Sequence, residues 1–356
     1  MKHDSDLSRV IINATAACIG HDGYDNEPAP AIGRTGVTPL TKLFELAGKR
    51  IYVAGHRGMV GAALVRHLRK LGIEPLTTTR DDVDLRNQAD VRHWFEANKP
   101  EVVFVAAATV GGILANATRP AEFIYDNLVI ETNLIDAAHR NDTQRVIFLG
   151  SSCIYPKHAS QPISENSLLT GSLEPTNQWY AIAKIAGVKL AQAFREQYGR
   201  HYISVMPTNL YGRGDNFNLE GAHVIPALMR KAHEAKHSGA HSLSVWGTGE
   251  VRREFLLVDD LADALVFLAE HYDHPEPINV GVGNDVTIRE LAELVCDVVG
   301  FKGKIATDPT KPDGTPRKLL DVGRINALGW QAQTPLETGL RDTYDWFLQN
   351  LGKLRS

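Results

Sequence analysis

The stretch KRIYVAGHRGMVGAALVRHLRKLG, at residues 49–72, decides the fold. It opens with a short apolar run at 51–54, typical of a buried strand, and residues 62–71 then carry apolar side chains at helical spacing. Between the two lies a glycine turn that contains Gly55, Gly58 and Gly61. A strand that enters a helix through such a turn presents backbone N–H groups and the positive end of the helix dipole to a pyrophosphate. The stretch therefore predicts a dinucleotide site that also includes Met59 and Val60.

Strand-like and helix-like segments alternate along the chain that follows. We expect strands at 74–79, 102–107, 146–149 and 203–206, and helices at 91–98, 121–141 and 181–198. This alternation predicts an α/β fold of the Rossmann type, a doubly wound parallel sheet with right-handed crossovers. Ligands of such sheets collect beyond the carboxyl ends of the strands, so the loops at those ends are the ones to search for chemistry.

Composition excludes several classes of protein. The 356 residues are 43% apolar and 22% charged, as in ordinary globular proteins, and a net charge of −4 gives no basic field for nucleic acid or an anionic membrane. The three cysteines, Cys18, Cys153 and Cys296, form no C-x-x-C pair, which argues against a zinc site or a disulfide framework. Without a membrane-length apolar run or a secretory signal, we expect a cytoplasmic protein that binds no metal.

Two arginines suggest which dinucleotide is bound. Arg80 follows the second expected strand, where a cation would meet the 2′-phosphate of NADPH, and Arg57 lies inside the glycine turn. Both favour NADP(H) over NAD(H). The alternative is that both are surface arginines, since Asp81 and Asp82 could neutralise Arg80.

Other small or polar residues would line the rest of the cofactor site. We expect Asp84 and Leu85 near the adenine. A small-residue loop at the end of the third strand would let the phosphates and ribose lie against backbone, and it contains Ala106, Ala107 and Ala108.

A possible catalytic trio comes from the next strand and helix. Tyr180 and Lys184 are four residues apart and so stand on one helix face, and Ser151 lies at a strand end. An ammonium beside a phenol is expected to lower the pKa of Tyr180, and the same lysine can bond the nicotinamide ribose. The trio predicts proton transfer coupled to hydride transfer. A structural tyrosine and a surface lysine are the alternative.

These motifs together resemble the extended short-chain dehydrogenase/reductase family, in its sugar-nucleotide branch, over residues 49 to about 350. Finer blocks narrow the match: GHRGMVG at 55–61, VGGILAN at 110–116, GSSCIYPK at 150–157, EPTN-x-x-YAIAKIAG at 174–187, MPTNLYG at 206–212, HVIPAL at 223–228, REFL-x-VDD at 253–260 and DGTPRKLLD at 313–321. The resemblance implies an enzyme that takes GDP-4-keto-6-deoxy-D-mannose, epimerises C3 and C5, and reduces the C4 ketone with NADPH.

Cys153 and His223 are suited to the epimerisation that the resemblance implies. A C4 ketone acidifies the hydrogens on C3 and C5, so one group must remove a proton and another must return it to the opposite face. A thiolate is a competent base, and histidine titrates near neutrality. His223 is also expected at the cofactor. The alternatives are a small buried cysteine and a histidine that only begins a helix.

The C-terminal third is expected to bind the nucleotide sugar. Arg253 is the favoured diphosphate clamp, because a guanidinium makes paired bonds to phosphate, and Trp246 would border the guanine. Lys231 stands where the family usually has a second arginine, and it lacks the planar fork. The other expected substrate contacts are Ser151, Ser152, Cys153, Asn209 and Lys318. Exposed salt bridges are the alternative for Arg253 and Lys318.

The expected organisation has three parts. Residues 1–46 would be a poorly ordered extension, 47–210 a Rossmann domain that binds NADP, and 211–356 a smaller α/β lobe that binds substrate and interleaves with the sheet. The resemblance also implies a homodimer, in which the helices at 121–141 and 181–198 of two subunits form a four-helix bundle.

Two other functions remain possible. The chain could be another NADP-dependent sugar-nucleotide epimerase or reductase, or a non-catalytic NADP-sensing protein. A sensor would not need Ser151, Tyr180 and Lys184 together.

Overall fold

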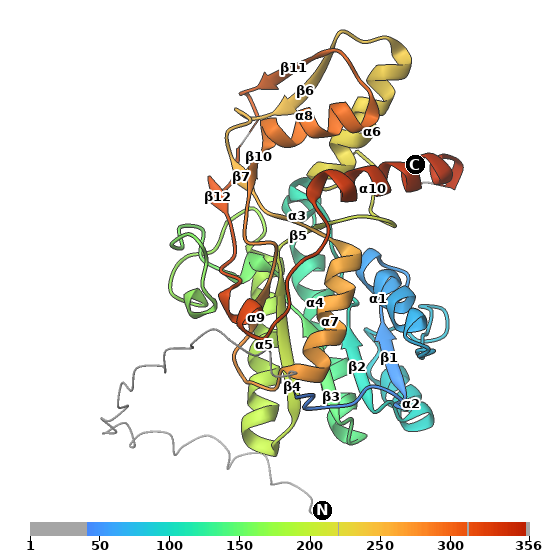
Figure 1. Cartoon of the computed structure of the whole chain (residues 1–356). Coiled ribbons are helices and arrows are strands. Elements are labelled where there is room, and N and C mark those ends of the chain that lie inside the picture. The colour runs from blue at the N-terminus through green and yellow to red at the C-terminus, as the bar shows by residue number, and fades with distance from the viewer. Residues whose placement is uncertain (1–40, 220, 312, 354–356) are drawn as a thin grey trace, which may run out of the picture. The chain divides into compact units, whose positions relative to one another are not determined.

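A five-stranded parallel sheet forms the centre of the structure (Figure 1). The structure is a computed structural model that describes residues 41–219, 221–311 and 313–353, except the side chains of residues 113, 114 and 353. The strand order is β1-β2-β3-β4-β9. The strands span Ile51–Ala54 (β1), Val102–Val105 (β2), Arg145–Leu149 (β3), His201–Pro207 (β4) and Ile278–Val280 (β9). Every neighbouring pair is parallel. The predicted Rossmann-type sheet is therefore confirmed.

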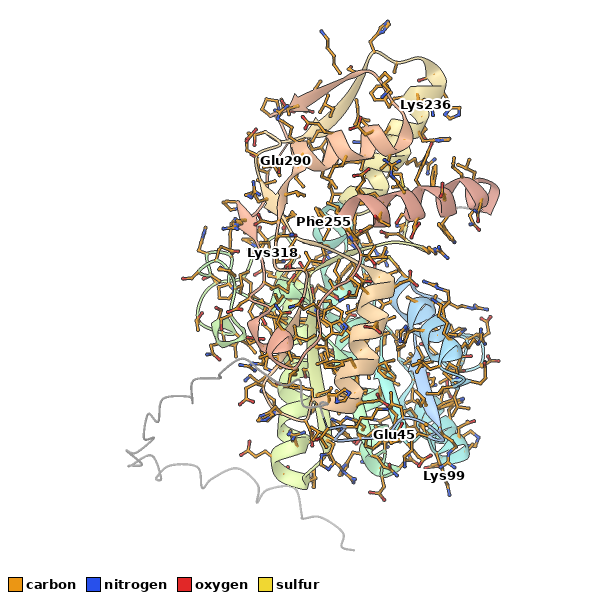
Figure 2. The ribbon with its side chains drawn as sticks, in the orientation of Figure 1. Glu45, Lys99, Lys236, Phe255, Glu290 and Lys318 are labelled. Atoms are coloured by element: carbon orange, nitrogen blue, oxygen red, sulfur yellow. The ribbon has the colours of Figure 1, made fainter. Side chains whose placement is uncertain are left out.

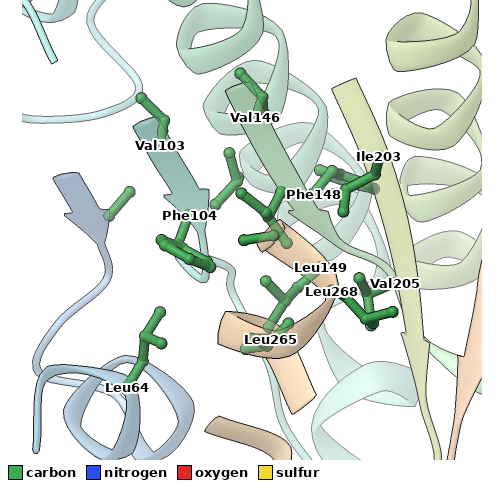
Figure 3. Packing of buried hydrophobic residues seen from close by; sticks show 14 of the residues in the cluster. Leu64, Val103, Phe104, Val146, Phe148, Leu149, Ile203, Val205, Leu265 and Leu268 are labelled. Carbon is green, nitrogen blue, oxygen red and sulfur yellow. The ribbon is translucent and has the colours of Figure 1, made fainter. Parts of the chain in front are cut away.

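Helices cover both faces of this sheet, as the continuous burial of its strands requires. On one face α1 packs against α7, and on the other α4 packs against α2 and α5 (Figure 1). Their bounds are Met59–Lys70 (α1), Gln88–Asn98 (α2), Pro120–Arg140 (α4), Gln178–Tyr198 (α5) and Val258–His271 (α7). Figure 3 shows Leu64 of α1 and Leu265 of α7 near Phe104 of the sheet, all fully buried. The predicted helices are thus present, with ends shifted by a few residues.

The strand predicted at 74–79 is wrong. Only Leu76 pairs with β1: its N–H donates to Ile51 O at 2.7 Å, and its carbonyl accepts from Val53 N at 3.0 Å. Pro75 has no N–H to donate, and Thr77 is exposed. The segment therefore passes along the sheet edge without forming a longer ladder.

Part of the predicted N-terminal extension belongs to the folded body. The N–H groups of Leu43 and Phe44 donate to Glu270 O at the end of α7, at 2.7 and 3.1 Å, and Leu46 is 1% exposed. The end of the extension is therefore ordered by backbone hydrogen bonds and a buried leucine. Residues 1–40, with Cys18, lie outside the described residues.

A second group of elements comes from segments before and after β9 of the central sheet, and it has its own apolar core. It contains a parallel pair, β6 (Ser242–Trp246) with β11 (Lys304–Asp308), and the helices α6 (Val224–Ser238), α8 (Ile288–Val299) and α10 (Leu336–Asn350). Helix α8 begins with a capping box, in which the Thr287 hydroxyl accepts from Glu290 N and the Glu290 carboxylate accepts from Thr287 N.

Short strands join this group to the central sheet. β5 (Asn209–Tyr211) pairs with β8 (Phe255–Leu257), and β7 (Arg252–Arg253) lies between β10 (Val286–Thr287) and β12 (Arg317–Lys318). The remaining short elements are α3 (Ile113–Thr118), η1 (Ser152–Ile154), η2 (Glu165–Ser167), α9 (Gly323–Ala327) and η3 (Leu351–Lys353). Among the described residues, no helix is both long and apolar enough to cross a membrane.

Candidate active site

The glycine turn after β1 has room for a ligand only because it lacks side chains. Gly55 has a left-handed φ of 86°, and a Cβ there would lie 2.7 Å from the backbone of Ala107. A Cβ on Gly61 would lie 2.2 Å from Gly55 O. Gly58 is the N-cap of α1, so no capping side chain covers the backbone N–H groups of Met59 and Val60 in the first turn. This cradle of open N–H groups fits a dinucleotide pyrophosphate.

The loop after β2 closes the other side of this cradle. Ala106 N donates to Ala54 O at 3.1 Å, which places the small residues Ala106, Ala107 and Ala108 beside the glycine turn. All three are half-buried. Small side chains here leave space next to Gly55, as the sequence predicted.

Arg57 and Arg80 both reach solvent near this turn. The Arg80 side chain is 68% exposed, and its Nε lies 4.0 Å from Asp84 Oδ2. Asp84 is bound more closely by Arg86, which lowers its pKa to about 2. The Thr79 hydroxyl lowers the pKa of Asp82, and Arg57 contributes to that shift.

Arg57 and Arg80 therefore both lie near the acids of the segment at residues 79–84, Arg57 near Asp82 and Arg80 near Asp84. The acid that meets Arg80 is Asp84, and not Asp81 or Asp82 as the alternative supposed. Leu85 is held in the same segment by its carbonyl, which accepts from Asn133 Nδ2 at 3.0 Å.

The end of β3 places a thiol among hydrogen-bond donors. Ser151 caps η1, with its Oγ accepting from Cys153 N at 3.2 Å, and Ser152 beside it is buried. Cys153 Sγ accepts from Asn177 Nδ2 at 3.2 Å and from Lys318 Nζ at 3.6 Å. A thiolate accepts such bonds more strongly than a neutral thiol does. The surroundings of Cys153 therefore suit a base more than a small core residue.

Lys184 is buried beside a carboxylate. Its side chain is 3% exposed, and Nζ lies 3.7 Å from Glu131 Oε2, 4.8 Å from the centre of the Phe148 ring and 5.9 Å from that of Tyr180. Burial lowers the pKa of Lys184, and Glu131 opposes that shift. Burial also raises the pKa of Glu131 to about 7, against the opposing effect of Lys184. The lysine is thus not the surface residue that the alternative supposed.

The expected effect on Tyr180 is reversed in this structure. Burial raises the pKa of Tyr180, and the negative charges of Cys153 and Glu131 raise it further. Lys184 is held by Glu131 and does not offset this. The phenol therefore keeps its proton near neutral pH, as a proton donor requires.

Two predicted substrate residues, 65 positions apart, are direct neighbours. β12 runs parallel to β7 with Lys318 opposite Arg253. The alternate residues Arg252 and Arg317 both bind Asp285, with Nε–Oδ distances of 2.7 and 2.5 Å. Side chains alternate across a strand. Arg253 and Lys318 therefore lie on the opposite face from Arg252 and Arg317, which bind Asp285.

Arg253 and Lys318 lie on the face that Asp285 does not occupy. Lys318 meets Cys153 there, at the end of β3, and Arg253 Nη1 donates to Arg252 O at 2.8 Å. Figure 2 shows Lys318 at the opposite end of the sheet from Lys99, which precedes β2, so Lys318 lies toward the carboxyl ends of the strands. Burial lowers the pKa of Arg253, and Asp313 and Glu174 oppose that shift.

The remaining predicted residues lie further along the chain. His223 is the exposed N-cap of α6, near Gly221, whose carbonyl accepts from Gly112 N at 3.3 Å. Although the residue is exposed, the ring lies partly against protein, and this partial desolvation lowers the pKa of His223. Asn209 Nδ2 donates to Glu254 O at 2.8 Å, so one of its donors is already used.

Trp246 is 56% exposed, with Lys231 Nζ 5.4 Å and Lys311 Nζ 5.5 Å from its ring centre. An exposed indole between two ammonium groups offers a stacking surface. No hydrogen bond or ring contact within the described residues links His223 or Trp246 to Cys153, so their convergence on one substrate stays a prediction.

Sequence reasoning missed three residues that the structure brings into this region. Asn177 lies within the EPTN motif that was quoted, but its contact with Cys153 was not anticipated. Lys311 flanks Trp246, and no motif marked it. Glu131 had one usable signal, since it is an acid among the buried positions of α4.

Comparison with known proteins identifies the family. Residues 51–281 match the model of the NAD dependent epimerase/dehydratase family. The chain belongs to this family. Among its relatives, a GDP-L-fucose synthase of Arabidopsis thaliana is 58% identical over 303 residues, covering 85% of this chain and 94% of the relative. One of Sinorhizobium fredii (strain NBRC 101917 / NGR234) is 55% identical over 309 residues, covering 87% and 98%.

Solved structures agree with this assignment. A GDP-L-fucose synthetase of Naegleria fowleri, bound to NADP, has a TM-score of 0.81 and 29% identity, covering 89% of this chain and 99% of that one. Membership of the NAD dependent epimerase/dehydratase family makes the chain an enzyme with a nicotinamide cofactor, which the cradle around Gly55, Gly58 and Gly61 fits. Within residues 41–219, 221–311 and 313–353, no three His, Cys, Asp or Glu side chains gather as a metal site would require.

Proposed function

We propose that the protein converts GDP-4-keto-6-deoxy-D-mannose to GDP-L-fucose, by epimerising C3 and C5 and then reducing the C4 ketone with NADPH. The observation that carries this proposal is the placement of Cys153, a thiol with two N–H donors, on the η1 segment that packs against the helix of Tyr180 and Lys184. A simple ketoreductase needs no such base. The GDP-L-fucose synthases that are 55% and 58% identical support the same substrate.

In the epimerisation, Cys153 removes the proton from C3 and then from C5. His223 returns a proton to the opposite face of the sugar each time. Between the two epimerisations Cys153 gives its proton to solvent and His223 takes one from solvent, so that each group can act again. Ser151 and Tyr180 donate hydrogen bonds to the C4 oxygen, and so stabilise the negative charge that develops there as each proton leaves.

In the reduction, Tyr180 donates its proton to the C4 oxygen. NADPH, when bound, supplies the hydride to C4. The glycine turn binds the pyrophosphate, while Lys184 bonds the nicotinamide ribose and supports the charge that remains on the Tyr180 oxygen. Of the remaining cofactor residues, Asp84 and Leu85 border the adenine, and Ala106, Ala107 and Ala108 leave room for the ribose.

The substrate's GDP group extends from this centre toward the C-terminal residues. Arg253 binds the diphosphate, and Lys318 lies between it and the reacting sugar. The guanine stacks on Trp246, with Lys231 beside the ring, while Asn209 and Ser152 bind polar groups of the sugar. The exposed face of the indole and its flanking ammonium groups support this assignment.

The proposal is tested by incubating the protein with GDP-4-keto-6-deoxy-D-mannose in heavy water, first alone and then with NADPH. Deuterium at both C3 and C5, followed by NADPH oxidation, is the expected result. NADPH oxidation without deuterium would identify a plain 4-ketoreductase and remove the roles of Cys153 and His223. The absence of both deuterium incorporation and NADPH oxidation would contradict the proposed substrate.

The preference for NADPH should depend on Arg57 and Arg80. Replacing both with alanine removes two cations at the 2′-phosphate, and the ratio of kcat/KM for NADPH to that for NADH should fall about ten- to hundredfold. Arg69→Ala is the matched control, because it removes an exposed arginine from α1 that is bound to Glu74. An unchanged ratio in the double variant would rule out these two residues as the determinants.

We also propose a homodimer formed through α4 and α5. The outer faces of these helices expose Tyr125, Trp179 and Ile182, at 64%, 42% and 38%. Exposed large apolar side chains of this kind suit a subunit interface. A light-scattering mass of two chains is expected, and a mass of one chain would contradict it. The cytoplasmic location and the division at 47–210 and 211–356 stay predictions.

A further inference from the structure

A buried carboxylate behind the proposed reductase centre has no part in the mechanism above. Glu131 lies on α4 and is 2% exposed. Both carboxylate oxygens are buried, and the groups that stabilise their charge within the described part of the chain are Lys184 and the backbone N–H of Gly187. The cation that faces it is Lys184, with Nζ 3.7 Å from Oε2. A buried carboxylate is costly even beside a cation, so the position of Glu131 next to this lysine calls for an explanation.

The surrounding residues make room for this pair. A Cβ on Gly187 would lie 2.9 Å from Glu131 Cδ and 2.3 Å from Phe148 Cζ, so a glycine is needed where α5 passes α4. The Phe148 ring lies 4.8 Å from Lys184 Nζ on the side of β3. The carboxylate, the ammonium and the ring therefore form one packed group that leaves Lys184 little freedom to move.

The charge of Lys184 depends on this group. Burial in apolar surroundings favours the neutral amine, and a carboxylate within about 4–6 Å favours the ammonium. The other titratable groups near Lys184 are Tyr180 on α5 and, next to it, Cys153 on η1; β3 contributes only the uncharged Phe148. No second cation or acid is among these neighbours, so Glu131 supplies the compensating charge.

We propose that Glu131 is a positioning residue of the reductase step, which keeps the Lys184 ammonium charged and fixed in its buried place beside Tyr180. This inference rests on the proposed function, since it gives Lys184 a role in hydride and proton transfer. Glu131 touches neither substrate nor cofactor in this scheme. Its effect is transmitted through Lys184 alone.

The test compares Glu131→Gln, which keeps the shape and removes the charge, with the wild type between pH 7 and 10. Burial raises the pKa of Glu131 to about 7, so the wild-type carboxylate is mostly ionised only above about pH 8, where the two rates are compared. We expect kcat/KM for NADPH oxidation to fall about tenfold or more at pH 8. The alkaline limb of the profile should move to lower pH by about one unit, because Lys184 loses its proton more easily without the carboxylate. Deuterium exchange at C3 should fall much less, since Cys153 performs that step.

Two further variants separate this effect from a general loss of structure. Glu131→Asp keeps the charge and should restore most of the wild-type alkaline limb. Asp136→Asn removes another acid of α4, one that binds Arg92 and Arg140, and should leave the profile unchanged.

A wild type that does not oxidise NADPH would refute the proposed function. An active wild type with the same alkaline limb in Glu131→Gln would refute only the role of Glu131. If the glutamine variant does not fold, Glu131→Met decides, because it also removes the carboxylate. An alkaline limb at the wild-type pH in that variant would overturn the inference.

Discussion

Tyr180→Phe should slow the NADPH-dependent reduction of GDP-4-keto-6-deoxy-D-mannose by about 10²- to 10⁴-fold in kcat. The phenol is the proposed proton donor to the C4 oxygen, and burial raises its pKa so that it holds a proton at neutral pH. Phenylalanine fills the same space and cannot donate. The measurement is the loss of NADPH absorbance under saturating substrate, together with NADPH binding followed by fluorescence, which should change little.

The deuterium exchange of the same variant separates the two half-reactions. Exchange at C3 should fall less than reduction does, because Ser151 still donates to the C4 oxygen. Tyr198→Phe is the control on the same helix, since its phenol is 50% exposed and bonds only Gln197 among the described residues. A Tyr180→Phe enzyme that reduces at the wild-type rate would require another proton donor.

The fold was predictable where one local signal sufficed. The 51–54 run, the glycine turn and the helix after it agree with β1, Gly55 and α1, because strand, turn and helix each have their own residue pattern. The segment at 74–79 failed for a physical reason: its apolar and threonine residues suggested a strand, while Pro75 cannot donate to the ladder and only Leu76 pairs with β1. Propensity alone does not reveal how much of an edge segment finds a partner.

The site was predictable where residues share one helix or one turn. Tyr180 and Lys184 lie on one helix face because of their spacing, and the alanines after β2 meet the glycine turn because parallel strands end together. The pairing of Arg253 with Lys318 depends on the register between β7 and β12, which no local pattern specifies.

The contact between Glu131 and Lys184 could not be predicted for a similar reason, because it depends on how α4 packs against α5. The pKa of Tyr180, which is raised where the sequence predicted that it would be lowered, also depends on packing. Spacing predicted the neighbouring ammonium, but burial and Glu131, both properties of the packed state, decide the direction of the pKa shift.

Cys153→Ser should reduce deuterium exchange at C3 and C5 by about 10²- to 10⁴-fold, which is the contribution expected of a positioned general base. A serine hydroxyl has nearly the same shape but does not ionise near neutral pH, so the hydrogen bonds from Asn177 and Lys318 would then reach a neutral oxygen. NADPH oxidation should fall less than exchange, because Tyr180 and Lys184 remain and can reduce the C4 ketone of the substrate before it is epimerised. This is the reverse of the pattern expected for Tyr180→Phe. The ratio of deuterium exchange to NADPH oxidation should therefore fall in Cys153→Ser and rise in Tyr180→Phe, which is the strongest check that the two residues act in different steps.

Cys296→Ala provides the matched control for the thiol. Cys296 is the other cysteine among the described residues, 6% exposed on α8, and burial raises its pKa to about 11. Its removal should leave exchange unchanged, after correction for any loss of folded protein measured by thermal unfolding. Wild-type exchange in Cys153→Ser would mean that another group abstracts the protons. The two donors on the Cys153 sulfur would then serve only to hold η1 against the start of α5 and against β12. The chain would need a different base within reach of C3 and C5.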